Sequence, residues 1–255
     1  MRFASLGSGS RGNATLIESG DTLLILDCGF SVKETQRRLA RLDIELDQLT
    51  AILVTHEHGD HINGVARLAR KCQIPVWVSS GTRVCLPDQN IPIIREFNSH
   101  ESFVIGGLQI QPFPVPHDAR EPCQFVFSDD VLRLGVLTDV GEITRHICDC
   151  LDGCHGLLLE CNYDPEMLRT GEYPPSLKKR VAGRFGHLSN EQAAGLLQQI
   201  DLQQLQHLVI AHISEKNNTP ELAHQALESM MTGMLEKITV IHQDEGLGWH
   251  QLSRG

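Results

Sequence analysis

The sequence lacks several features that would place it in other classes of protein. No apolar run approaches the length of about eighteen residues that a transmembrane helix needs. The first residues hold no long apolar segment before a cleavage site, and no Pro/Ser-rich or low-complexity stretch divides the chain. We therefore expect one domain spanning residues 1–255 that lies in the cytoplasm and not in a membrane.

The sequence also lacks an excess of basic residues. A net charge of −10 argues against broad, tight, nonspecific binding of duplex DNA, which generally needs an extended basic surface. It remains compatible with an enzyme that engages a few terminal phosphates in a narrow cleft. Divalent ions bound there would add local positive charge that the composition does not count.

None of the usual zinc-finger spacings occurs among the eight cysteines. The one cluster, C-x-C-x3-C-x6-C, comprises Cys148, Cys150, Cys154 and Cys161. Reduced thiols fit a cytoplasmic protein. We interpret these four side chains as small buried hydrophobic groups.

Hydrophobic residues make up 41% of the chain, enough for a large core, and their pattern predicts a mixed α/β protein. Strands are expected at 2–6, 14–18, 22–27, 51–55, 75–78, 103–105, 108–113, 124–128, 132–138, 156–160, 207–211 and 238–242. Helices are expected at 32–42, 62–71, 142–151, 190–199 and 220–230. Capping boxes at Ser31 and Ser189 and an N-cap at Thr219 mark three of the helix starts.

The most informative segment is residues 55–61, with the sequence THEHGDH. It follows the apolar residues 51–54, so it leaves a buried strand, and Gly59 gives the turn its backbone freedom. Its His and Asp side chains are ligands for zinc, iron or manganese, and such crowding would be costly without a cation. Four potential metal ligands are His56, His58, Asp60 and His61.

This His-x-His-x-Asp-His pattern after an apolar strand resembles the signature of the metallo-β-lactamase superfamily. The resemblance implies three further ligands in a fixed order along the chain. His117 in VPHD fits the next position, Asp139 after GVLT the following one, and His212 after LVIA the last. The resemblance thus covers essentially the whole chain and implies an αββα sandwich of two mixed β-sheets flanked by helices.

The implied ligand set has a chemical logic of its own. One ion would be held by His56, His58 and His117, and its neighbour by Asp60, His61 and His212. Asp139 would bridge them, because a carboxylate has two oxygens. Two divalent ions roughly 3.5–4 Å apart acidify a bridging water into a hydroxide nucleophile, so the expected activity is hydrolysis.

Two features narrow the class of hydrolase. Class B β-lactamases lack a bridging carboxylate where this chain has Asp139, so hydrolysis of β-lactam antibiotics is not expected. The interval from Asp139 to His212 is too short for the extra domain of the β-CASP nucleases.

Three motifs resemble those of the YycJ/WalJ branch: residues 186–190 (GHLSN), 212–220 (HISEKNNTP) and the opening 5–13 (SLGSGSRGN). That branch is associated with 5′-to-3′ exonuclease activity on DNA. The resemblance therefore implies a phosphodiesterase that acts on DNA ends, with two divalent ions (zinc, manganese or iron) per chain.

A basic stretch, residues 178–184, holds four Lys or Arg in an otherwise acidic chain and leads to His187 and a helix start. Backbone N–H groups at a helix start favour an anion, so we expect Arg184, His187 and Ser189 to bind substrate phosphate. The alternative is a solvated basic loop with His187 as a structural turn residue.

Two catalytic residues are expected. Asp60 would orient the hydroxide, and His187 would donate to a phosphoryl oxygen or protonate the leaving oxygen. Asp27, after an apolar strand, matches a superfamily position that supports the ligand loop without touching the metal.

Other functions stay open at this stage. A thioester hydrolase of the glyoxalase II type has the same ligands, although the short tail after His212 offers no obvious glutathione site. A phosphodiesterase for cyclic nucleotides or other small molecules is a second alternative. A metal-binding sensor or redox partner is the non-enzymatic one.

Overall fold

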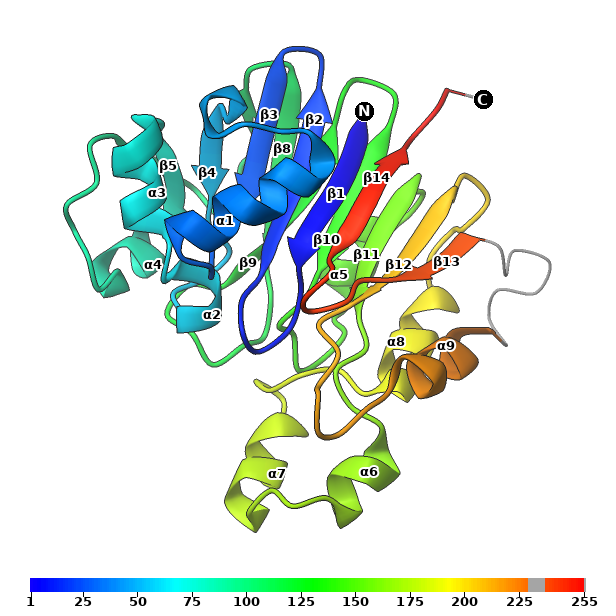
Figure 1. The fold of residues 1–255 in the computed structure, drawn as a ribbon. Coiled ribbons are helices and arrows are strands. Elements are labelled where there is room, and N and C mark those ends of the chain that lie inside the picture. The colour runs from blue at the N-terminus through cyan, green and yellow to red at the C-terminus, as the bar shows by residue number, and fades with distance from the viewer. Residues whose placement is uncertain (229–236, 255) are drawn as a thin grey trace.

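A computed structural model describes residues 1–228 and 237–254. These residues form two seven-stranded sheets that pack face to face (Figure 1). The first sheet has the order β14-β1-β2-β3-β4-β5-β6. Its strands are β1 (Arg2–Gly7), β2 (Ala14–Ser19), β3 (Thr22–Leu26), β4 (Ala51–Leu53), β5 (Val76–Ser79), β6 (Ile94–Phe97) and β14 (Leu247–Gln251).

The second sheet has the order β13-β12-β11-β10-β9-β8-β7. Its strands are β7 (Phe103–Ile105), β8 (Leu108–Pro114), β9 (Cys123–Ser128), β10 (Arg133–Leu137), β11 (Gly156–Glu160), β12 (His207–Ala211) and β13 (Ile238–Val240). Each sheet combines antiparallel pairs, such as β1 with β2 and β8 with β9, with parallel pairs, such as β3 with β4 and β11 with β12. Both sheets are therefore mixed.

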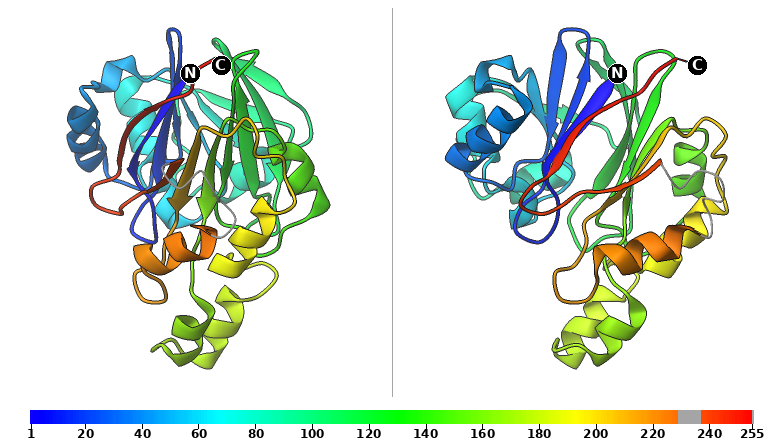
Figure 2. Two further views of the ribbon diagram at one scale, coloured as in Figure 1. Left: turned by 90° about the vertical axis from the view of Figure 1, so that its right-hand side faces the viewer. Right: turned by 45° about the vertical axis from the view of Figure 1, so that its right-hand side comes forward.

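Helices cover the outer faces of both sheets, as the three views of Figures 1 and 2 show. Before β11 they are α1 (Val32–Leu39), α2 (Gly59–Ile62), α3 (Val65–Cys72), α4 (Ser80–Cys85) and α5 (Arg145–Leu151), with the 3-10 turns Ala40–Leu42 and Leu46–Gln48. After it come α6 (Pro165–Thr170), α7 (Pro175–Val181), α8 (Asn190–Leu197) and α9 (Pro220–Glu228).

The core has three layers because side chains alternate along each strand. In β3, Leu24 packs between the sheets, whereas Ile25 packs outward under α1 and α3. In β11, Leu158 packs between the sheets, and Leu157 packs outward under α5 and α8. Central strands such as β3, β4 and β11 are buried on both faces, which explains why they read as continuous apolar runs. The predicted αββα sandwich is confirmed.

The predicted elements agree with the structure except at edges and short helices. The predicted helix 62–71 corresponds to α3, which begins three residues later at Val65, after the chain turns at Gly64, whose N–H bonds to Cys28 O. The short helix α2, which lies within the ligand segment, was not predicted. Two strands were missed, β6 and β14; both are edge strands with polar or charged residues. The helices α4, α6 and α7 were also missed. The last two residues of the predicted helix 220–230 lie outside the described residues.

The predicted helix starts are present, with one difference in detail. Ser189 forms a complete capping box with Gln192, and Thr219 Oγ1 accepts from Leu222 N at 3.2 Å. Ser31 caps α1, but Glu34 does not return to it. That carboxylate instead accepts from two arginines of the same helix, so the predicted box at Ser31 is only a cap.

The pair α6 and α7 stands off from the sandwich in all three views. No side chain of α7 is buried. Elsewhere, Cys148, Cys150, Cys154 and Cys161 are buried in the core beside α5 and α8, as expected for small hydrophobic groups. Within the described residues, no helix combines the length and apolar character needed to cross a membrane.

Candidate metal centre

The predicted ligands come together at one edge of the sandwich, because each of them follows a strand. Residues 56–61 follow β4 of the first sheet, whereas His117, Asp139 and His212 follow β8, β10 and β12 of the second. Asp139 and His212 adopt left-handed backbone conformations, with φ of 54° and 53°. Residues rarely adopt such angles outside tight turns, and functional sites often contain them.

The first group consists of His56, His58 and His117, whose ligand atoms lie within 4.8 Å of one another. Hydrogen bonds to backbone carbonyls fix two of these rings. His58 Nε2 donates to Asp118 O at 3.2 Å, and His117 Nδ1 donates to Gly186 O at 3.0 Å. The remaining nitrogens, His58 Nδ1 and His117 Nε2, face each other at 3.2 Å and are the atoms available to a metal.

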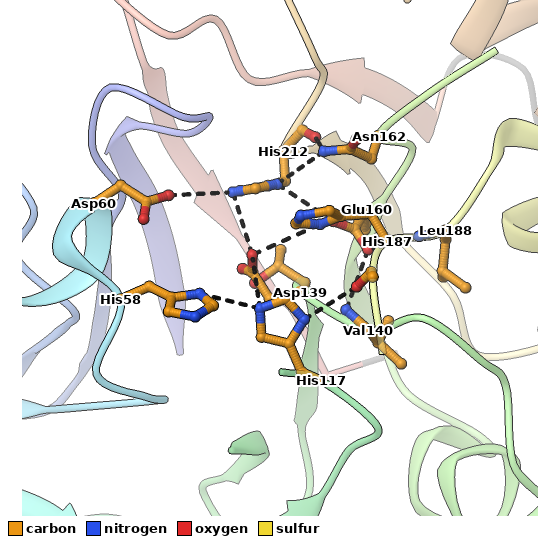
Figure 3. A network of polar contacts seen from close by, with 12 residues as sticks. His58, Asp60, His117, Asp139, Val140, Glu160, Asn162, His187, Leu188 and His212 are labelled. Atoms are coloured by element: carbon orange, nitrogen blue, oxygen red, sulfur yellow. Dashed lines mark hydrogen bonds and ion pairs between the residues drawn. The ribbon is translucent and has the colours of Figure 1, made fainter. Parts of the chain in front are cut away.

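The second group consists of Asp60, His61 and His212. Asp60 Oδ2 lies 3.5 Å from His61 Nε2 and 3.7 Å from His212 Nε2. Asp139 stands between the groups, with Oδ2 3.2 Å from His61 Nε2 and Oδ1 3.9 Å from His117 Nε2. Asp139 therefore lies between the two groups (Figure 3), and its bridging of two ions stays a prediction.

Asp27 lies behind the ligand loop, where the sequence analysis expects it. It has a left-handed backbone, with φ of 60°. Its carboxylate accepts from His61 Nδ1 at 2.7 Å and from the hydroxyl and N–H of Thr55. Thr55 Oγ1 in turn lies 2.9 Å from His56 Nδ1. One buried carboxylate thus orients a ring in each group and leaves both Nε2 atoms for the metal.

The electrostatics of the site suit divalent cations. Burial lowers the pKa of His212, but attraction by the carboxylates of Asp139, Asp60 and Glu160 outweighs it and raises that pKa to about 10. Burial raises the pKa of Asp139, yet the charged His212 and His61 hold it well below its ordinary value. Carboxylates that stabilise the positive charge of nearby protonated histidines attract a metal cation in the same way.

The donor atoms themselves also fit a metal. His56 Nε2 and His212 Nε2 are buried and have no hydrogen-bond partner among the described residues. Burial lowers the pKa of His56 and His117, so these rings are neutral, which is the form that binds metals. An unpaired buried nitrogen is costly unless something coordinates it. The cluster is therefore able to hold metal.

Glu160, at the end of β11, is a site residue that the sequence analysis missed. Its fully buried carboxylate accepts from His187 Nδ1 at 2.8 Å and lies 3.2 Å from His212 Nδ1. Its second oxygen accepts the backbone N–H groups of Val140 and Leu188. The available signal was a glutamate that ends an apolar strand, since such a buried acid must have partners.

Two asparagines that the sequence analysis did not assign also contact the ligand residues. Asn13, in the glycine-rich opening loop, donates to Asp60 Oδ2 at 3.2 Å and reaches His61 Nε2 at 3.1 Å. Asn162 donates to His212 O at 3.0 Å. The opening loop therefore supports the second ligand group from behind.

The three residues expected to bind substrate lie in different surroundings. His187 lines the pocket above the ligand cluster, with 22% of its side chain exposed. Arg184 forms an ion pair with Glu142 and does not line this pocket. Ser189 is buried as the N-cap of α8, so the structure does not bring Arg184 and Ser189 to the cluster as it brings His187.

One pocket of about 360 Å³ opens over the cluster. Its floor contains His58, Asp60, Asp139, His187 and His212. Its walls come from the opening loop, the segment after β12, and α7 with the residue Tyr173 that precedes it. The volume is within the range of roughly 300–1,000 Å³ that is usual for small-molecule pockets.

A sandwich of two mixed sheets with a His/Asp cluster at its edge defines a class of metal-dependent hydrolases. The profile of the β-lactamase superfamily domain matches residues 22–213, and the chain belongs to the metallo-β-lactamase superfamily. It is 33% identical over 235 residues to exodeoxyribonuclease YycJ of Bacillus anthracis, covering 91% of this chain and 89% of that one. It is 32% identical over 239 residues to exodeoxyribonuclease WalJ of Streptococcus pneumoniae, covering 91% and 88%.

The fold is also similar to that of YhfI from Bacillus subtilis, a metallo-β-lactamase fold protein. The TM-score is 0.75 at 14% identity, and the superposition covers 98% of each chain. The recognised superfamily and its YycJ/WalJ branch are thus confirmed, and the chain is a hydrolase of this superfamily.

Proposed function

We propose that this protein is a dinuclear-metal phosphodiesterase that removes nucleotides from the 5′ ends of DNA. The observation that carries the proposal is the single pocket whose floor joins the ligand cluster to His187. The similarity of this chain to two exodeoxyribonucleases, over 91% of its length, supports DNA as the substrate. A cytoplasmic location and a single-domain organisation remain predictions.

Two metal ions would share the site in the way the two ligand groups suggest. One ion would be held by His56, His58 and His117, and the other by Asp60, His61 and His212. Asp139 would contribute a ligand to both ions. When bound, such ions lower the pKa of water and offset the charge that builds on the attacked phosphate. The ligand types accept zinc, manganese or iron alike.

His187 would supply a proton to the leaving oxygen. Glu160 accepts from its Nδ1, which leaves Nε2 for the pocket. Burial lowers the pKa of His187, but attraction to Glu160 and the hydrogen bond between them outweigh it and raise the pKa. A raised pKa favours the protonated ring, the form that a general acid must have before it acts.

Asp60 would hold the nucleophile in line with the phosphorus. Burial raises its pKa, but attraction by the neighbouring His212 and His61 lowers it far below the ordinary value, so the carboxylate is ionised. Its position beside Asn13 and at the pocket floor makes it an acceptor with a fixed direction.

The test is hydrolysis of 5′-labelled single-stranded DNA by metal-stripped protein that is reloaded with manganese or zinc. We expect metal-dependent release of nucleotides from the 5′ end. His187→Ala should lower kcat by about 10²- to 10⁴-fold while the metal content persists. Asp60→Ala should abolish activity.

Three other outcomes would contradict parts of the proposal. Release from the 3′ end would reverse the polarity. Cleavage of S-lactoylglutathione with intact DNA would replace a nuclease with a thioester hydrolase. Hydrolysis of cyclic nucleotides alone would make the substrate a small phosphodiester.

A further inference from the structure

The segment between β11 and α8 forms a projecting arm made of α6 and α7 (residues 165–181). The arm contacts the site through α7. Lys178 Nζ donates to Arg169 O at 2.8 Å and ties the two helices together. Arg180 Nε donates to Asp118 Oδ2 at 2.6 Å, directly beside the ligand His117.

Close backbone packing holds the end of the arm against the metal centre. Gly186 is buried, and a β carbon there would overlap the carbonyl oxygens of Arg180 and Val181. The same glycine accepts from His117 Nδ1 through its own carbonyl. The position of α7 is therefore coupled to that of a ligand ring.

One face of α7 looks into the pocket. Leu177, Arg180 and Val181 all line it, and their spacing of three and four residues puts them on the same side of the helix. Tyr173, four residues before Leu177, lines it as well. Lys179 does not line the pocket, because its position faces another side.

The chemistry of this face is suited to a nucleotide. The side chains of Tyr173, just before α7, and of Leu177 and Val181 are aromatic or apolar, although no side chain of α7 is buried in a core. Arg180 is the one Lys or Arg among the described residues that line the pocket. In its ion pair with Asp118, the side chain of Arg180 is 61% exposed, and such exposed ion pairs contribute little to stability. A phosphate, by contrast, can accept two hydrogen bonds from one guanidinium.

We propose that α7 forms the nucleotide-binding wall of this site. Tyr173, Leu177 and Val181 receive the sugar and base beside the scissile phosphate, and Arg180 leaves Asp118 to bind a neighbouring phosphate. This inference rests on the proposed function and specifies its substrate. The pocket, of about 360 Å³, has the size usual for small-molecule sites, so it receives the terminal nucleotide of a strand.

The test compares two substrates of the metal-loaded protein. One is a 5′-phosphorylated single-stranded oligonucleotide, and the other is bis(p-nitrophenyl) phosphate, which has neither a base nor a second phosphate. Arg180→Gln and Leu177→Ala should each lower the ratio of the two kcat/KM values roughly tenfold, mainly through KM for the oligonucleotide. Lys179→Gln is the matched control and should leave the ratio within about twofold.

A further readout separates this role from a structural one. Arg180→Gln should reduce the dependence of log KM on log salt by about 0.7, the value for one phosphate contact on a single strand. Because no side chain of α7 is buried, both variants should fold with wild-type metal content.

The outcomes distinguish failure of this inference from failure of the proposed function. Hydrolysis of DNA with unchanged ratios in Arg180→Gln and Leu177→Ala would overturn the inference alone. A wild type that cleaves the small diester but no DNA would overturn the proposed function and this inference with it.

Discussion

At the scale of single residues, Glu160 arranges two histidines with one buried carboxylate. Its pKa is raised by burial but lowered more strongly by His187 and by hydrogen bonds, to about 2. It therefore stays ionised and orients both His187 and His212. Partners behind a ligand ring commonly affect both metal affinity and rate.

We predict that Glu160→Gln weakens metal binding by about 10- to 100-fold and lowers kcat, because His212 and His187 lose their common acceptor. Equilibrium dialysis and steady-state kinetics on the reloaded protein measure the two effects. Glu166→Gln is the matched control, an exposed glutamate paired with Arg169. Equal metal affinity in Glu160→Gln and the wild type would contradict this role.

The contrast between predicted and missed site residues has a physical cause. Four ligands of residues 55–61 are adjacent in sequence, so their spacing alone indicated a metal. His117, Asp139 and His212 were found through a family pattern. Glu160 and Asn13 have no ligand spacing to a neighbour in the sequence, since each acts on residues far away along the chain. Only the fold brings them to the site.

At the scale of secondary structure, helix ends explain residues that resemble substrate ligands in the sequence. Ser189 Oγ accepts from Gln192 N at 3.1 Å, and Gln192 returns to Ser189 N at 2.9 Å. The hydroxyl is thus committed to starting α8, the helix that carries part of the outer core.

Ser189→Ala should lower the free energy of unfolding by about 1 kcal/mol, the usual contribution of a serine N-cap. Urea denaturation measures this change. Ser189→Asn, which also caps helices well, should recover most of the loss. A rise in KM for DNA in a variant of unaltered stability would instead assign the hydroxyl to substrate binding.

The helix α1 provides a pH-dependent contact far from the metal centre. The hydrogen bond from Arg37 is the largest influence that lowers the pKa of Glu34, and Arg38 adds to it, giving a value of about 2. Arg38 is buried and also donates to Leu6 O at 2.6 Å, so it links α1 to β1.

Because the folded pKa of Glu34 is below the unfolded one, its contribution is complete above about pH 4.5 and is lost as the pH falls toward 2. Glu34→Gln should therefore be less stable than the wild type at pH 7, by roughly 1 kcal/mol for this partly exposed group. Urea denaturation at several pH values should show the difference shrinking below pH 4.5. A difference that is constant down to pH 3 would contradict the assignment.

The strands β6 and β14 and the helix α7, which the sequence analysis missed, lack a regular pattern of buried apolar residues. The strands β6 and β14 lie at sheet edges, where charged and polar residues interrupt the apolar run. The helix α7 has no buried side chain, so no apolar stripe faced a core and hydrophobic periodicity could not reveal it. The same absence is what leaves its inner face free for substrate.

At the scale of the whole molecule, the ligand cluster joins the two sheets. His56, His58, Asp60 and His61 follow β4 of the first sheet, whereas His117, Asp139 and His212 follow strands of the second. The apolar layer between the sheets fixes this edge in place. Metal ions would therefore bind only where the folded sandwich brings both loops together, and binding adds directly to folding stability.

We expect metal-stripped protein to unfold at a lower temperature than reloaded protein. At a free metal concentration of 100 times Kd, one site adds about 2.7 kcal/mol. Differential scanning calorimetry over a series of manganese or zinc concentrations should show a Tm that rises with the logarithm of concentration. Asp139→Ala should show a much smaller rise, because both groups lose the carboxylate between them. A Tm that is independent of metal in the wild type would contradict a site built from both sheets.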